Sequence, residues 1–215
     1  MMDALEEYIL QHATAEDALL TELDRVTHQT VMQPRMISGN VQGRFLRMLV
    51  QMMRPHRVLE IGTFTGYSAI CMASGLEDGA ELDTVEVDDE LQSLAQSFFD
   101  RCPFGDKINL HIGSALDVVP RLGRKYDLVF MDGDKREYPQ YYAMLMGDGG
   151  NRASVGSGSV ILADNVLWYG KVADPRCNDR HTEAIRRFND MAAADSRVEC
   201  TILPLRDGIN MIRVK

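Results

Sequence analysis

Short apolar runs alternate with amphipathic stretches along most of this chain. The strand-like runs are RVLEIG, LDTVEV, INLHIG, YDLVFMD and SVILAD. Each is followed by a stretch with apolar residues at helical spacing, namely YSAICMASGL, DELQSLAQSFFD, SALDVVPRL, KREYPQYYAMLM and the later HTEAIRRFNDMAAA. This alternation predicts parallel strands with helices on both faces of one sheet.

The two ends of the chain follow other patterns. Residues 2–28 predict two helices, and a third is expected from Ser38 through Met53, all before the first strand. The chain closes with VECTILPL and INMIRVK, joined around Asp207-Gly208, a dipeptide that favours a hairpin. We therefore predict a doubly wound, mostly parallel seven-stranded α/β sheet with N-terminal helices and an antiparallel final strand.

Length and charge limit the class of protein. A chain of 215 residues with 45% apolar content can bury one substantial core, so a single domain over residues 1–215 is expected, with helices over 1–53 and an α/β core over 57–215. Acidic residues outnumber basic ones by 32 to 23, which gives a net charge of -9. Nucleic acid is not the expected partner, because phosphate backbones require a basic footprint.

The N-terminal segment, the cysteines and the glycine-rich segment do not point to a particular reaction. The segment MMDALEEYILQHATAEDALL does not resemble an export signal, and no apolar run is long enough for a membrane span, so a cytoplasmic protein is expected. Cys71, Cys102, Cys177 and Cys200 form no C-x-x-C pair, which favours buried free thiols. The glycine-rich segment 147–158 predicts a mobile surface loop without a packed element.

Candidate chemistry lies where the strand-like runs end. The polar residues at these positions are Glu60, Glu86, Asp132 and the pair Asp164-Asn165. Ligands of open parallel sheets bind beyond the carboxyl ends of the strands, and carboxylates that lie close together need a cation or ligand hydroxyls between them. Each acid alone is more often a turn or cap residue. Four together predict a metal, a cationic cofactor or both.

The segment VLEIGTFTGYS predicts a tight ligand-binding turn. Gly62 and Gly66 have the spacing G-x-x-x-G after an acid, whereas a nicotinamide site would have G-x-G-x-x-G. An acid at this place would repel a pyrophosphate but suits a positively charged ligand such as S-adenosylmethionine. Glu86, about 20 residues further on, is placed to bind ribose hydroxyls. The alternative is a glycine turn needed only for packing the strand against its helix.

Nearly the whole chain resembles the catechol and caffeoyl-CoA type O-methyltransferases, especially their small bacterial members. The segments that carry the resemblance are PRMISGNVQGRFLRMLVQMM, VLEIGTFTGYS, VEVDDE, GSA, FMDGDKREYPQYY, LADNVLWYG and LPLRDGINMIRV. The joint occurrence of D-x-D-K and D-N after consecutive strands is the most specific part. The resemblance implies a Rossmann-like methyltransferase fold, a homodimer, and N-terminal helices that form part of the active-site cover.

The resemblance also implies roles for individual residues. The residues around S-adenosylmethionine would be Met36, Glu60, Gly62, Ser68, Glu86, Ser114, Ala115 and Asp132, with Glu86 on the ribose and Ser114-Ala115 on the adenine. The metal ligands would be Asp132, Asp164 and Asn165. Two carboxylates and an amide oxygen suit Mg²⁺ and tolerate Mn²⁺ or Ca²⁺.

Lys135 is the catalytic base that the resemblance implies. The alternative for it is a surface salt bridge with Asp134 or Glu137. Trp168 and Tyr169 are placed to form the acceptor pocket, although an aromatic side chain there can also serve packing alone.

The expected reaction is metal-dependent methyl transfer from S-adenosylmethionine to a hydroxyl of a small vicinal diol. One alternative is O-methylation of a hydroxylated uridine in tRNA, for which a basic stripe would use Arg35, Arg44, Arg47 and Lys171. Two others are a protein that senses S-adenosylmethionine without turnover and a nicotinamide oxidoreductase. The intact D-x-D-K and D-N motifs disfavour the sensor, and the glycine spacing disfavours the oxidoreductase.

Overall fold

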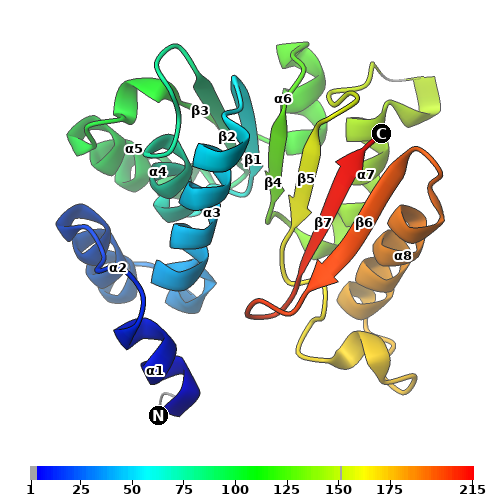
Figure 1. Cartoon of the computed structure of the whole chain (residues 1–215), viewed down its shortest axis with the longest axis horizontal. Helices are drawn as coiled ribbons and strands as arrows, with labels where there is room; N and C mark the ends of the chain where they lie inside the picture. Colours follow the sequence, from blue (N-terminus) through cyan, green and yellow to red (C-terminus); the bar gives the residue numbers. More distant parts are fainter. Residues whose placement is uncertain (1–3, 151) are drawn as a thin grey trace.

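A computed structural model describes residues 4–150 and 152–215, whose strands form one seven-stranded sheet (Figure 1). The strands are β1 (Arg57–Ile61), β2 (Glu81–Glu86), β3 (Ile108–Ile112), β4 (Leu128–Met131), β5 (Val160–Ala163), β6 (Val198–Leu203) and β7 (Ile209–Val214). Each overlaps a run that the hydrophobic pattern predicted as a strand, so the prediction of seven strands is confirmed.

The strand order is β3-β2-β1-β4-β5-β7-β6. Strands β1 to β5 pair in parallel, and β7 is antiparallel to both β5 and β6, as the hairpin prediction required. The chain moves outward from β1 to β3 and then returns to β4 on the other side of β1. The strand order therefore reverses between β1 and β4, which is where ligands of such sheets bind.

Helices cover both faces of the sheet (Figure 1). The α-helices are α1 (Ala4–Gln11), α2 (Ala18–Thr30), α3 (Gly39–Met53), α4 (Tyr67–Ala73), α5 (Gln92–Arg101), α6 (Ala115–Leu122), α7 (Tyr138–Met146) and α8 (Arg180–Ala194). Short 3₁₀ helices are η1 (Pro34–Met36), η2 (Asp89–Leu91), η3 (Gly105–Lys107), η4 (Lys135–Glu137), η5 (Asp148–Gly150) and η6 (Lys171–Ala173).

The alternation of side chains along each strand assigns the helices to their faces. Val58 and Leu82 lie in a core cluster with residues of α2 to α5, whereas Leu59 and Val85 lie in a second cluster with residues of α6 to α8. Neighbouring residues of a strand point to opposite faces, so both faces of these strands are buried. Within the described chain, no helix is long and apolar enough to cross a membrane.

Two expectations from the sequence need correction. The glycine-rich loop was predicted to lack packing, but Ser154 and Val155 are buried, and the Tyr126 N–H donates to the Ser154 carbonyl at 2.8 Å. The small and apolar residues after the glycines allow this half of the loop to dock on the core. Buried thiols are confirmed for Cys71 and Cys102, whereas the free thiols of residues 177 and 200 are partly exposed.

Candidate active site

The carboxyl ends of β1, β2, β4 and β5 carry the four carboxylates predicted at one edge of the sheet. Glu60 is the last residue but one of β1, and Glu86 ends β2. Asp132 and Asp164 directly follow β4 and β5, and their backbone N–H groups still donate to carbonyls of the neighbouring strands at 2.8 and 3.0 Å. The two aspartates are therefore held on adjacent strand ends.

The glycine turn brings the end of β1 close to Asp132. Gly62 has φ +100°, and a Cβ at this position would lie 2.6 Å from the Asp132 carbonyl oxygen, so no other residue fits without a shift. A hollow opens beside this contact. It is lined by Met36, Ile37, Ser38, Gly62, Thr63, Phe64, Tyr67, Ser68 and Asp132. Four of the residues predicted to bind S-adenosylmethionine therefore share one hollow.

Glu60 is fully buried next to this hollow. Its carboxyl oxygens accept hydrogen bonds from the hydroxyls of Ser68 and Thr84, each at 2.5 Å. Burial raises the pKa of Glu60 to about 8, although both hydroxyls oppose the shift. The carboxyl is thus protonated near pH 7 in the protein alone, and a nearby cationic ligand would favour its ionised form.

Glu86 is fixed by backbone donors. Its carboxylate accepts from the N–H groups of Phe64 at 2.7 Å and of Val87 and Asp88 at 2.9 Å each. The alternative that a strand-end acid serves to stabilise a turn is therefore correct in part for Glu86. A carboxylate has about four lone-pair sites, however, so three donors leave room for a ligand hydroxyl.

The predicted adenine residues lie next to Glu86 through the backbone. The Gly113 N–H donates to the Glu86 carbonyl at 2.8 Å, and Ser114 and Ala115 follow directly at the start of α6. The residues expected around the ribose and the adenine are thus neighbours across β2 and β3.

Lys135 points into the site and not to the surface. It is 8% exposed, and its Nζ donates to Asp132 Oδ1 at 2.5 Å and to the Tyr138 hydroxyl at 2.8 Å. The alternative of a surface salt bridge with Asp134 or Glu137 is wrong. The turn of η4 directs Lys135 inward, and Asp134 pairs with Arg136 instead. Burial raises the pKa of Asp132 to about 6, with Lys135 opposing the shift.

Asp164 and Asn165 complete the predicted ligand set. Asp164 is 3% exposed and accepts from Gln42 Nε2 at 2.6 Å and from the Asn165 N–H at 2.8 Å. Asn165 has φ +56°, and its side-chain amide has no hydrogen-bond partner among the described residues. Its amide oxygen is thus free to bind a ligand.

The donor set fits a hard cation. No group of three or more His, Cys, Asp or Glu in the described part of the chain could hold a metal ion. The candidate set therefore depends on two carboxylates and the Asn165 amide oxygen. An all-oxygen set of this kind suits Mg²⁺, Mn²⁺ or Ca²⁺ and not Zn²⁺.

Sequence reasoning missed Gln42 and Tyr138. Gln42 is 1% exposed on the buried side of α3, among apolar residues, and this polar position within an apolar stripe was the available signal. The Tyr138 hydroxyl lies 2.9 Å from both the Met131 and the Asp164 carbonyl oxygens, so it joins the ends of β4 and β5.

The residues after Asn165 form a strained loop. Trp168 and Tyr169 have φ +47° and +56°, which residues other than glycine seldom adopt. The Trp168 ring stacks on His181 with ring centroids 5.5 Å apart, whereas Tyr169 is 82% exposed. Their role in an acceptor pocket stays a prediction.

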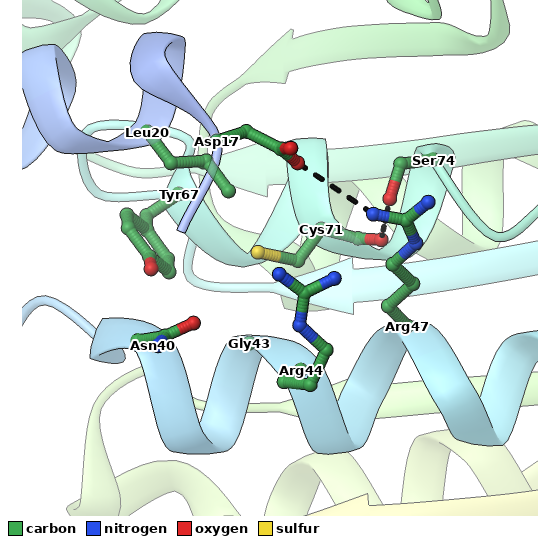
Figure 2. Close-up of a pocket in the computed structure, with 9 residues that line it drawn as sticks. All are labelled: Asp17, Leu20, Asn40, Gly43, Arg44, Arg47, Tyr67, Cys71 and Ser74. Atoms are coloured by element: carbon green, nitrogen blue, oxygen red, sulfur yellow. Dashed lines mark hydrogen bonds and ion pairs between the residues drawn. The ribbon is translucent and has the colours of Figure 1, made fainter. Parts of the chain in front are cut away.

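A second hollow lies between α2, α3 and α4 (Figure 2). Here Arg47 pairs with Asp17 at 3.6 Å, and Arg44 donates to the Ala15 carbonyl at 2.8 Å. Lys171 pairs with Asp179 at 3.6 Å next to α8, which covers the other face of the sheet. These three basic side chains have partners within the chain, and Lys171 lies on the other face of the sheet, so they do not form one stripe. Arg35, the fourth residue of the predicted stripe, is exposed in η1.

Solved structures share this fold over the whole chain. An O-methyltransferase from Bacillus cereus in complex with SAH superposes with a TM-score of 0.90 at 31% identity, covering 99% of this chain and 97% of that one. The O-methyltransferase TomG from Streptomyces achromogenes, in complex with SAM, gives a TM-score of 0.90 at 28% identity and covers 100% of both chains.

Sequence comparison gives the same relationship. The O-methyltransferase family matches residues 10–215. A catechol O-methyltransferase from Niastella koreensis is 32% identical over 100% of this chain and 98% of its own length. A caffeoyl-CoA O-methyltransferase from Eucalyptus gunnii is 30% identical over 98% of this chain and 87% of its own length. The chain belongs to the family of S-adenosylmethionine-dependent O-methyltransferases that includes the catechol and caffeoyl-CoA enzymes.

Proposed function

We propose that this O-methyltransferase acts on one hydroxyl of a small vicinal diol such as a catechol. The reaction requires a divalent cation, for which Mg²⁺ is the first candidate. One observation carries the proposal. Asp132 lines the hollow assigned to S-adenosylmethionine and also adjoins Asp164 and Lys135. A carboxylate shared by two sites would bring the methyl donor and the acceptor hydroxyl to adjacent positions.

The cofactor residues proposed are those of the hollow and of the strand ends beside it. Glu86 would accept hydrogen bonds from the ribose hydroxyls, and Ser114 and Ala115 would flank the adenine. S-adenosylmethionine supplies an electrophilic methyl group on a sulfonium. Glu60, buried beneath Ser68, would balance positive charge on the ligand by losing its proton.

Asp132, Asp164 and Asn165 would hold the cation. The chemistry that such a cation supplies is a lower pKa for the acceptor hydroxyl and orientation of two adjacent oxygens. The names of the catechol and caffeoyl-CoA relatives support an aromatic diol as acceptor.

Lys135 would accept the proton of the acceptor hydroxyl as a neutral amine, after the ammonium proton that it donates to Asp132 in this structure has passed to solvent. Tyr138 positions it, because the tyrosine hydroxyl accepts from Lys135 Nζ and lies within hydrogen-bond distance of the strand-end carbonyls. Alignment of the two reactants can supply about 7 to 11 kcal/mol of the lowering of the barrier. No covalent intermediate with the protein is needed.

Methyl transfer from labelled S-adenosylmethionine to catechol and to phenol tests the proposal. The diol offers two adjacent oxygens, whereas phenol offers one and keeps a pKa near 10. We expect methylation of catechol with Mg²⁺, little of phenol, and none of either in chelator. Equal rates on both acceptors, or full activity in chelator, would contradict the metal-dependent reaction and leave the family assignment intact.

A further inference from the structure

Arg206 connects the turn between β6 and β7 to the candidate active site. Its Nη1 donates to the carbonyl oxygens of Ile37 at 3.2 Å and of Ser38, and to Gln42 Oε1 at 3.1 Å. Its backbone has φ +50°, a conformation that suits glycine better than arginine. An arginine kept in a strained backbone conformation suggests that its side chain has a role.

Gln42 extends this contact to a candidate metal ligand. Its Oε1 accepts from Arg206, and its Nε2 donates to Asp164 Oδ2 at 2.6 Å. A guanidinium can only donate and a carboxylate can only accept, so these two partners fix the orientation of the buried amide. The hydrogen bonds thus run without a break from Arg206 through Gln42 to Asp164.

Arg206 also contacts the hollow predicted to bind S-adenosylmethionine. Ile37 and Ser38, whose carbonyl oxygens Arg206 holds, line the same hollow as Met36 and Gly62. Arg206 is therefore joined both to the wall of that hollow and, through Gln42, to the carboxylate of Asp164. A ligand that fixes either end restricts the positions available to the other.

We propose that Arg206 and Gln42 are positioning residues that couple the cofactor hollow to the cation site, so that cofactor and cation each strengthen the binding of the other. The inference rests on the proposed function, because Asp164 must be a metal ligand. By thermodynamic linkage the two effects are equal, and it is enough to measure one of them.

Two substitutions of Arg206 separate coupling from a merely structural role. Arg206→Gly removes the guanidinium and relieves the left-handed backbone, whereas Arg206→Lys keeps a cation with N–H donors. Arg54→Gly is a matched control, because Arg54 also has φ +50° and pairs with Glu77 far from the site. A structural role would change thermal stability in the Arg206 variants without changing coupling.

The experiment is a calorimetric titration of Mn²⁺ into each protein with and without saturating S-adenosylhomocysteine. In the unaltered protein we expect Mn²⁺ affinity to rise by about fivefold or more when S-adenosylhomocysteine is present. The ratio of the Mn²⁺ affinities with and without S-adenosylhomocysteine should fall in Arg206→Gly and in Gln42→Leu to the part that the shared Asp132 carboxylate provides. It should be largely restored in Arg206→Lys and unchanged in Arg54→Gly.

The outcomes are distinguishable. Mn²⁺ binding with the same ratio in the unaltered protein and in Arg206→Gly would overturn the coupling and leave the proposed function standing. A ratio near one in the unaltered protein would do the same. Absence of any Mn²⁺ binding to the unaltered protein would overturn both the cation site and the coupling.

Discussion

Two groups of buried carboxylates in the same sheet have different partners. Asp83, in the middle of β2, is 1% exposed and accepts from Arg124 at 3.0 Å, from the Tyr126 hydroxyl at 3.0 Å and, at 2.8 Å, pairs with His111. An arginine and two further groups surround this one carboxylate. Its interactions are satisfied within the protein.

The carboxylates at the strand ends are satisfied less completely. Glu60 has hydroxyl partners and Asp164 has amide donors, while Lys135 is the one ammonium paired with Asp132 within the described residues. Burial raises the pKa values of Glu60, to about 8, and of Asp132, to about 6. The contrast indicates that a buried carboxylate with a cation of its own stabilises the fold, whereas clustered carboxylates that have one ammonium among them can receive a cationic ligand.

The largest effect is expected for Asp164→Ala. Loss of a candidate metal ligand should lower kcat by on the order of 10² to 10⁴, because a bound cation contributes several kcal/mol to the transition state. Secondary structure should change little, and so should the S-adenosylmethionine affinity measured without a divalent cation, when the cation cannot contribute to cofactor binding. The check is turnover with catechol beside a calorimetric titration of the cofactor, and activity close to that of the unaltered protein would refute the assignment.

Lys135→Ala should slow turnover by about 10²- to 10⁴-fold if Lys135 is the base. Lys135→Arg sharpens the test, because arginine keeps the ion pair with Asp132 but cannot accept a proton. Both variants should therefore be slow in single-turnover assays. Recovery of the rate in Lys135→Arg would show that the charge, and not proton transfer, is what the reaction needs.

Glu86→Ala should weaken S-adenosylmethionine binding by roughly 1.5 to 3 kcal/mol through loss of charge-assisted hydrogen bonds to the ribose. Glu86 also holds the Phe64, Val87 and Asp88 N–H groups, so the melting temperature must be measured in parallel. Unchanged affinity in calorimetry would remove Glu86 from the cofactor site.

Asp83→Asn tests the other side of the comparison. We expect a loss of about 1 to 3 kcal/mol in the free energy of unfolding, because charge-assisted hydrogen bonds to Arg124 are weakened. Since that arginine is 34% exposed, the lower half of the range is the better expectation. Urea denaturation gives the free energy of unfolding. A fall in kcat without loss of stability would show that Asp83 serves catalysis, and the distinction between Asp83 and the strand-end carboxylates would then fail.

Glu60 gives an effect on stability alone, which develops gradually with pH. Its folded-state pKa of about 8 lies above the ordinary value of 4.5, so its stabilising contribution is complete below that ordinary value and is lost as pH rises through the folded value. The free energy of unfolding of the cofactor-free protein should therefore fall between about pH 5 and 8, by at most about 1.4 kcal/mol per pH unit. Glu60→Gln should lack this slope in urea titrations, and an equal slope in both proteins would contradict the assignment.

Much of the fold and part of the site could be predicted because both follow from the succession of apolar and polar residues along short stretches of the sequence. Apolar runs end in Glu60, Glu86, Asp132 and Asp164, and parallel strands necessarily bring those ends to one edge. The packed half of the glycine-rich loop could not be predicted, since a turn composition does not show that Val155 finds space in the core.

Gln42 and Arg206 could not be found in the same way. Gln42 contacts Asp164 across 122 positions, and Arg206 contacts Gln42 across 164. Such contacts follow from the packing of α3 and the last hairpin around the strand ends, which no local pattern encodes. The predicted homodimer and the acceptor residues Trp168 and Tyr169 stay predictions.

Direct binding of a divalent cation tests the central claim. The claim is that the strand-end carboxylates bind ligands, whereas Asp83, which is fully hydrogen-bonded within the protein, does not. The measurement is a Mn²⁺ titration followed by electron paramagnetic resonance in the unaltered protein, Asp164→Ala and Asp83→Asn. We expect one site in the unaltered protein and in Asp83→Asn, and its loss in Asp164→Ala. No binding by the unaltered protein, or the same binding in Asp164→Ala, would contradict the account.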